Sequence, residues 1–253
     1  MLDHTYIHIP GIGQKTERHL WALGVRCWDD FLALEEPVPG LSPRRHGVIR
    51  DHLREARRSL DQGDFRYFAQ SLPPLETWRA WPHFRSRTGY LDIETTGMGA
   101  WAQVTVVGLY DGQRVRTYVH GENLDQLPED LARYAYLVTF NGATFDLPFL
   151  RRRFPGLDLC QVHSDLRYTL RRLGFRGGLK SIESQFGIRR SERTAGLDGW
   201  DAVRLWNEYR AGSQEALQLL VEYNTEDVAN LEGLMAAAYE GLREQTLAAV
   251  SAR

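Results

Sequence analysis

Acidic side chains in three separate segments of this sequence could act together on a metal ion. Asp92 and Glu94 lie two residues apart in the segment Gly89 to Glu94. Residues two apart on an extended strand project from the same face, so these carboxylates would stand side by side. Burying such a pair on an apolar strand is costly without a partner or a metal. The alternative is a solvated pair at a strand end.

The third and fourth acids are expected on helices. Asp146 follows a glycine turn, with Thr144 as a candidate cap, and an acid in a first helical turn can simply favour the helix dipole. Asp227 lies four residues after Tyr223 in a long helical stretch, so both face the same way, one turn apart. Each acid taken alone could have a purely structural role, but the acids taken together point to metal binding.

The sequence patterns around these residues indicate an α/β domain. Alternating or β-branched runs at 89–94, 104–110 and 114–120 end in turn residues and predict a three-strand meander. Helices are expected at about 127–134 and from about 144, and short strands at 137–140 and near 159–162. A long helix is expected over 214–243. The sequence therefore predicts a mixed β-sheet flanked by helices.

A smaller all-helical module is expected in front of this domain. Gly11 and Gly13 form a Gly-x-Gly turn, predicted to join two short helices. Helical residues follow to about Leu32, and a further helix is expected over 43–60. We predict three parts: a module at 1–36, a helical connector at 37–85, and the α/β domain at 86–253.

The acidic motifs, in this order, resemble the DEDD exonuclease superfamily, a branch with the ribonuclease H-like fold. The tyrosine four residues before the last acid marks its tyrosine branch. A closer resemblance is to the YprB-like ribonuclease H-like proteins, to which the segments 178–183, 200–203 and 223–228 are similar. This resemblance covers roughly residues 86–243 and implies a 3′-to-5′ exonuclease, a hydrolase acting on phosphodiester bonds.

The resemblance also implies roles for the site residues. Two Mg²⁺ or Mn²⁺ ions would be held by carboxylate oxygens, which hard cations prefer. Asp92 would bridge both ions, Glu94 and Asp227 would hold the one bearing the attacking water, and Asp146 would support the other. Tyr223, whose unperturbed pKa is near 10, would position the water rather than act as its base.

Nucleic-acid contacts are expected at two places. Backbone amides of Thr95 and Thr96 would contact the terminal nucleotide by the same resemblance, while Asn141 either holds the strand or shapes a turn. The amino-terminal turn resembles a helix-hairpin-helix element that presents amides to one phosphate. Its contact residues would be Gly11, Gly13, Lys15 and Thr16, although such a turn can also join two helices without binding anything.

Composition narrows the remaining possibilities. The net charge is −2, but six arginines lie between Arg44 and Arg58, and contacts from them would make nucleic-acid binding fall with salt. Cys27 and Cys160 match no disulfide or zinc pattern, and we expect both to be reduced and buried. No apolar run suggests a membrane span, so we expect a cytoplasmic protein, a monomer without an organic cofactor.

The expected partner is single-stranded or 3′-ended DNA, RNA or both, and the sequence does not choose between them. The main alternative is a catalytically idle nucleic-acid-binding protein that uses the same fold as a scaffold. Four mutually repelling acids argue against it, because a scaffold has no need of them.

Overall fold

The structure, a computed structural model, describes residues 1–251 and is built around a mixed sheet with the strand order β3-β2-β1-β4-β5. Strands β1 (Thr88–Thr95), β2 (Val104–Tyr110) and β3 (Val115–Val119) form the antiparallel meander. Strands β4 (Tyr136–Thr139) and β5 (Val162–Asp165) run parallel to β1. The predicted fold class, with its meander, is confirmed.

Strand β5 begins three residues later than the expected strand at 159–162. The last three residues of this strand are unusually polar for a buried strand, namely His163, Ser164 and Asp165. Their side chains form hydrogen bonds with residues of other elements. The hydroxyl of Ser164, for example, lies 3.0 Å from the hydroxyl of Thr77 and is bonded to that of Tyr136. These contacts are invisible to local sequence patterns.

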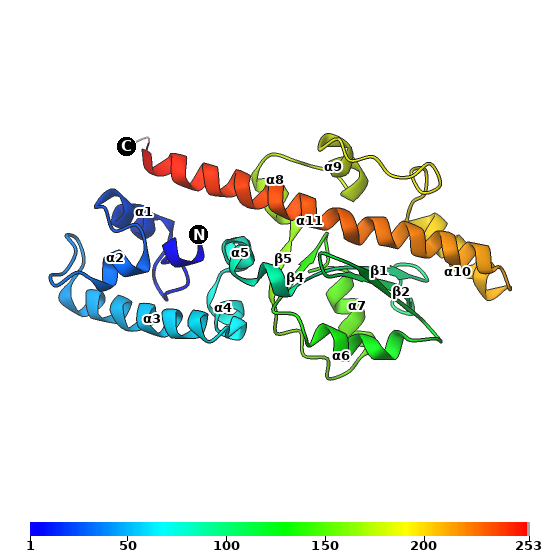
Figure 1. Cartoon of the computed structure of the whole chain (residues 1–253), viewed down its shortest axis with the longest axis horizontal. Coiled ribbons are helices and arrows are strands. Elements are labelled where there is room, and N and C mark those ends of the chain that lie inside the picture. The colour runs from blue at the N-terminus through cyan, green and yellow to red at the C-terminus, as the bar shows by residue number, and fades with distance from the viewer. Residues whose placement is uncertain (252–253) are drawn as a thin grey trace.

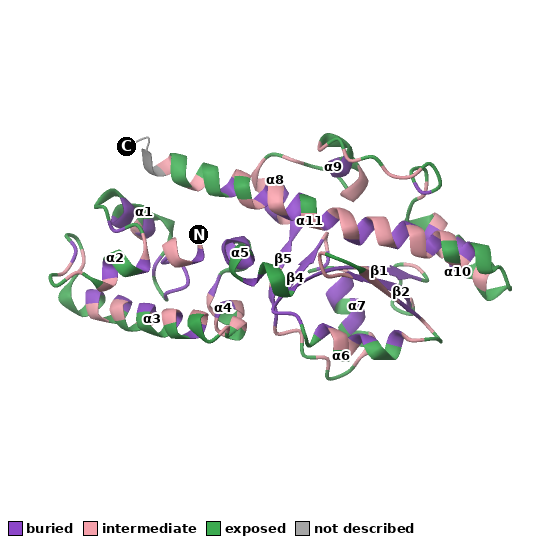
Figure 2. Cartoon of the chain, in the orientation of Figure 1, coloured by how far each residue is buried: buried purple, intermediate pink, exposed green. Residues whose placement is uncertain are grey.

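Helices cover both faces of the sheet (Figure 1). On one face, α10 (Gly199–Arg210) and the long α11 (Gln214–Ser251) pack on the sheet, with Val106, Trp206 and Leu220 in the shared core. On the other face, α6 (Leu127–Leu131) and α7 (Asp146–Arg153) cover a second core. The strands are mostly buried (Figure 2), which leaves few places where polar side chains meet solvent.

The amino-terminal part is helical, as predicted, but the glycine turn does not join two α-helices. A short 3₁₀ helix, η1 (Leu2–His4), and a run of turns precede it, and α1 (Gln14–Ala22) follows. In place of an α-helix, the segment before the turn forms a run of turns that packs Tyr6 and Ile9 into the core. Next come α2 (Trp28–Leu32), α3 (Pro43–Asp61) and α4 (Phe65–Ser71).

The remaining short elements connect these layers. They are η2 (Pro74–Ala80), α5 (Trp81–Phe84), η3 (Arg85–Arg87), η4 (Leu124–Gln126), α8 (Leu166–Arg172) and α9 (Leu179–Gln185). Figure 1 shows α11 extending from the sheet toward the amino-terminal helices. One apolar cluster runs from Trp28 through Trp81 and Tyr136 to Leu242, so both parts of the chain share a core.

A buried ion-pair network links α1 to η2. The guanidinium of Arg79 lies 3.1 Å from the carboxylate of Glu17 in α1 and 2.7 Å from that of Glu76. Cys27 and Cys160 are free, as expected, but only half-buried rather than buried. Among residues 1–251, no helix combines the length and the apolar character needed to cross a membrane.

Candidate metal centre

Strand β1 presents Asp92 and Glu94 on the face that α11 covers. Leu91 and Ile93 alternate with them and are buried in the opposite core. The strand lies between β2 and β4, so it is central in the sheet. The sequence expectation of two carboxylates side by side on a central strand is met.

Helix α11 brings the late motif onto this strand. Its Asn224 amide donates a 2.9 Å hydrogen bond to Oδ2 of Asp92. This approach requires glycine at position 108, opposite Asp92 in β2, because a Cβ there would lie 2.3 Å from Oδ1 of Asn224. Asp227 and Tyr223, on the same helix, therefore face the acids of β1.

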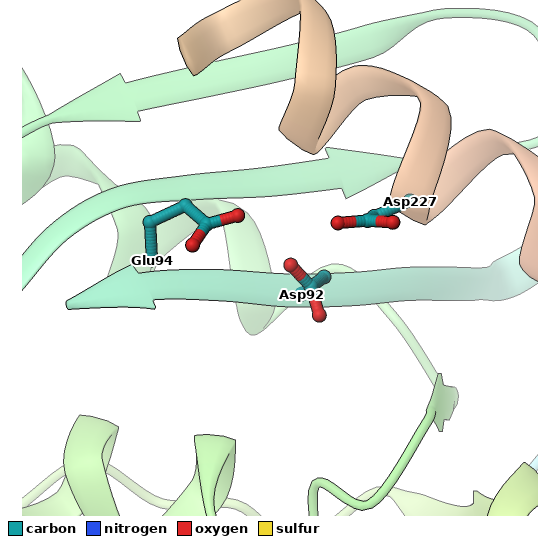
Figure 3. A group of neighbouring side chains, drawn as sticks. All are labelled: Asp92, Glu94 and Asp227. Atoms are coloured by element: carbon teal, nitrogen blue, oxygen red, sulfur yellow. The ribbon is translucent and has the colours of Figure 1, made fainter. Parts of the chain in front are cut away.

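Three of the four predicted acids converge closely. Asp92, Glu94 and Asp227 each offer a carboxylate oxygen, and these atoms all lie within 4.8 Å of one another. Figure 3 shows the three groups pointing toward a common space between β1 and α11. Glu94 and Asp227 are 8% and 5% exposed, so water screens their repulsion poorly.

The electrostatics of the cluster favour a bound cation. Burial raises the pKa of Asp92 and of Glu94 well above the usual range, and the nearby charges of Asp227 and Asp146 raise both further. Burial also raises the pKa of Asp227 to about 6, although Arg190 opposes this effect. Without a metal ion, the repulsion is relieved by taking up protons and by the ion pair of Asp227 with Arg190.

Asp146 lies at the first position of α7, close to this group but outside the tight trio. It is 2% exposed, and its Oδ1 has no hydrogen-bond partner among the described residues. Burial raises its pKa to about 8. A buried carboxylate oxygen without a donor is an available ligand, so Asp146 fits a supporting role at a cation.

The turn before Asp146 is fixed by Asp165, whose carboxylate accepts from the amides of Asn141 at 2.8 Å and Ala143 at 3.0 Å. Asn141 has a positive φ of 67°. Its side-chain oxygen accepts from Thr144 at 3.0 Å and Arg167 at 2.8 Å. Asn141 thus shapes the turn that positions Asp146.

Two basic residues that the sequence reading did not single out complete the site. Arg190 forms an ion pair with Asp227 and a bidentate pair with Glu183, with both Glu183 contacts at 2.7 Å. The Nζ of Lys180 lies 4.5 Å from the ring centroid of Tyr223 and has no hydrogen-bond partner among the described residues. Lys180 belongs to the segment 178–183 noted for its resemblance, which was the available signal. No local pattern marks Arg190.

Both cations lie near the ring of Tyr223, with Nζ of Lys180 4.5 Å and Cζ of Arg190 5.5 Å from its centroid. Burial raises the pKa of its hydroxyl above the ordinary value, and the charges of Asp227 and Glu94 raise it further. The phenol therefore stays protonated at neutral pH and can donate a hydrogen bond. This agrees with its expected role as a positioning group rather than a base.

Asp92, Glu94 and Asp227 open into a cleft of about 320 Å³, which Lys180, Ser181, Asp198 and Tyr223 also line. A neighbouring hollow shares Glu94 with it and is lined by Thr95, Met98 and Trp200 as well. The all-oxygen donor set suits Mg²⁺ or Mn²⁺ rather than zinc, which prefers nitrogen and sulfur. The residues present therefore fit the implied metal.

Thr95 and Thr96 were predicted to contact the terminal nucleotide through their backbone amides. The amide of Thr96 donates to the carbonyl of Gln103 at 2.9 Å, so it is not free to contact a nucleotide as expected. Thr95 is buried beside Glu94.

At the amino-terminal turn, Gly11 and Gly13 are exposed just before α1, with Gly11 at a φ of +76°. Lys15 is exposed and Thr16 half-buried in the first turn of α1. This turn lies outside the acidic cleft.

Comparison with known proteins identifies the fold. No curated protein matches the chain in sequence. One similar solved structure is a family B DNA polymerase from the hyperthermophilic archaeon Pyrobaculum calidifontis, at 16% identity and a TM-score of 0.47. The similarity covers 63% of this chain but only 24% of the polymerase. Residues 89–239 match the family model of the RNase H superfamily, so the chain belongs to that superfamily and its sheet has the RNase H-like fold.

Proposed function

We propose that this protein is a metal-dependent 3′-to-5′ exonuclease acting on DNA, RNA or both. The observation that carries the proposal is the convergence of three carboxylates from β1 and α11 within 4.8 Å, backed by buried Asp146. Such a cluster is unfavourable unless it binds cations. Membership of the RNase H superfamily agrees with nuclease chemistry.

The four acids would hold two Mg²⁺ or Mn²⁺ ions. Asp92, Glu94 and Asp227 form the tight group, and Asp146 offers its unpartnered Oδ1 from the side. When bound, such ions raise the acidity of a water and offset negative charge on the phosphate oxygens. Asn224 fixes the orientation of Asp92, and Arg190 fixes that of Asp227.

The basic and aromatic groups of the cleft would handle the substrate. Lys180 has free donors beside the acids, so its ammonium can bind a phosphate oxygen of the strand. The Tyr223 hydroxyl can donate to, or accept from, the attacking water and hold it in line. Its raised pKa supports a positioning role.

The finer assignments rest on resemblance. These are the tyrosine branch of the DEDD exonucleases, the YprB-like subtype, and the polarity of degradation. The amino-terminal turn at Gly11 and Gly13 would act as a helix-hairpin-helix element gripping one phosphate. The three-part division at residues 36 and 85, the monomeric state and the cytoplasmic location likewise remain proposals.

A matched pair of end-labelled strands tests the proposal. With Mn²⁺, a 5′-labelled oligonucleotide should shorten stepwise into a ladder, while a 3′-labelled one should release its label in the first step. Asp92→Asn should leave both strands intact while the protein stays folded. A ladder from the 3′-labelled strand would reverse the polarity, and no cleavage of any DNA or RNA strand would favour the idle-scaffold alternative.

A further inference from the structure

Besides the acidic cleft and the hollow lined by Met98, a further hollow lies on the α7 side of the sheet, and the mechanism above does not use it. It has a volume of about 470 Å³ and is lined by the loop after β1, by His120 at the end of β3, and by the last turns of α7. The residues that matter most here are Trp101, Phe149, Arg152 and Arg153. In contrast to the cleft, no acidic residue lines it.

Trp101 is the most exposed large apolar side chain of the described residues, at 95%. Its indole ring is therefore almost wholly available for contact with a ligand. A flat, exposed aromatic ring is also the group on which nucleic-acid bases stack without regard to their sequence.

Cationic groups lie beside this indole. Arg152 stacks over the ring of Phe149, with 4.3 Å between its guanidinium carbon and the ring centroid, and donates to the carbonyl of Ala102. It forms no ion pair within residues 1–251, which leaves several of its five donors available. Arg153, by contrast, is paired with Asp125 at 2.6 Å. Nδ1 of His120 is buried and also lacks a partner among the described residues.

The hollow lined by Met98 and the hollow lined by Trp101, called here the Met98 hollow and the Trp101 hollow, are linked by the loop between β1 and β2. The loop at 96–103 lines the Met98 hollow with Gly97 and Met98, and the Trp101 hollow with residues 100–103. Helix α7 begins at the candidate ligand Asp146, and Arg152 follows six residues later, roughly 9 Å along the helix axis. A strand whose end lies in the acidic cleft can therefore cross this loop and reach Trp101.

We propose that Trp101 and Arg152 form a subsite for single-stranded nucleic acid, next to the nucleotide being removed. Trp101 stacks on a base, and Arg152 contacts the neighbouring phosphate. The inference rests on the proposed exonuclease function and adds the path of the strand. Because base faces and phosphates are common to both polymers, DNA and RNA strands should both bind.

Equilibrium binding in chelator tests this subsite without requiring cleavage. The probes are 5′-fluorescein-labelled oligo(dT) and oligo(U), titrated at several salt concentrations. Trp101→Ala should bind about tenfold more weakly, the equivalent of losing about 1.4 kcal/mol of stacking. Arg152→Gln should lower the salt dependence, reducing the slope of log K against log salt by about 0.7, as expected for one phosphate on a single strand.

Two matched variants control for general surface effects. Leu75→Ala removes an apolar side chain that is 55% exposed on η2, and Arg133→Gln removes an arginine that is 58% exposed and lies outside the hollow. Both should bind like the wild type. Thermal unfolding of Trp101→Ala should be unchanged, because the side chain packs against little.

Wild-type affinity of Trp101→Ala for both polymers would overturn the proposal and would leave the indole as a contact for a protein partner. If Trp101→Ala binds more weakly in chelator and the wild type cleaves no strand when metal is added, the subsite is supported and the exonuclease proposal is rejected. The two proposals can therefore fail separately.

Discussion

At the scale of single residues, the buried acids of the candidate site repel one another when they are ionised. Asp146 shows this most clearly, because its buried Oδ1 has no donor and its pKa is raised to about 8. An unfolded aspartate has a pKa near 4. Between these values the folded state holds a proton that the unfolded state has released, so the contribution of Asp146 to stability is lost as pH rises through about 8.

Asp146→Asn should therefore stabilise the metal-free protein, and increasingly so at higher pH. We expect a small difference from the wild type at pH 5 and a gain of about 1 to 2 kcal/mol at pH 8, typical of relaxing a strained functional site. Urea unfolding in chelator at both pH values measures this. A difference that stays constant with pH, or a variant that is less stable at pH 8, would contradict it.

Lys180 is a basic residue of the cleft whose Nζ has no hydrogen-bond partner among the described residues. Lys180→Met should lower kcat/KM for strand cleavage by about tenfold or more, since a charge-assisted hydrogen bond contributes roughly 1.5 to 3 kcal/mol. Lys180→Arg keeps the charge and should retain much of the activity. Steady-state rates on a short oligonucleotide test this, and equal kcat/KM for Lys180→Met and the wild type would remove Lys180 from the mechanism.

The sequence identified the acids better than their partners. Asp92 and Glu94 are two apart on a strand, and Tyr223 and Asp227 are four apart on a helix, so local periodicity reveals each pair. Arg190 reaches Asp227 from an irregular segment after α9, at a sequence separation of 37 residues. No period connects such residues, and only the folded chain brings them together.

At the scale of elements, the close approach of α11 to β2 positions the site. Gly108→Ala would place a Cβ 2.3 Å from Oδ1 of Asn224 and 2.9 Å from Cγ1 of Val228. We expect α11 to shift away from the sheet. Overpacking of this kind costs about 1 to 3 kcal/mol.

Activity should fall more than stability in Gly108→Ala, because the shift also disturbs the bond from Asn224 to Asp92. Thermal unfolding and cleavage rates measure the two effects. Gly233→Ala, on the same helix but with no atom beyond its own stretch of backbone within 4 Å of the added Cβ, is the matched control and should be neutral or slightly stabilising. A fully active Gly108→Ala would show that the site tolerates movement of α11.

The elements themselves were predicted with uneven success. The meander and α11 follow clear patterns of alternation or helical period, and all of them are present. Strand β5 and the segment before Gly11 were misread because their conformations depend on tertiary contacts, such as the bonds of Ser164. The backbone amide of Thr96 was predicted to be free to contact a nucleotide, but it donates a hydrogen bond to the carbonyl of Gln103.

At the scale of the whole molecule, the shared core holds the amino-terminal helices against the rest of the chain, and the Arg79 network links α1 to η2. The side chains of Arg79 and Glu17 are 2% and 1% exposed. Glu17 also accepts hydrogen bonds from the hydroxyl of Thr5 and the amide of Tyr6. This placement would fix the glycine turn relative to the acidic cleft.

Arg79→Met should lower the free energy of unfolding by about 3 to 5 kcal/mol, because it leaves the buried carboxylate of Glu17 without its counter-ion, whereas Glu76 keeps its ion pair with Arg172. Adding Glu17→Gln should recover part of this loss. Urea unfolding of the single and double variants tests the network. A loss below about 1 kcal/mol for Arg79→Met would show that the junction depends on apolar packing alone.

The central claim is that the carboxylates of β1 and α11 form a metal-dependent nuclease site. The most direct measurement is the rate of nucleotide release from a labelled strand, followed as Mn²⁺ is added to chelated protein, for the wild type and Asp227→Asn. We predict that Mn²⁺ restores cleavage by the wild type and that Asp227→Asn stays at least a hundredfold slower, roughly the loss of about 2.7 kcal/mol of transition-state stabilisation. Equal rates for the two proteins, or wild-type cleavage that persists in excess chelator, would contradict the account.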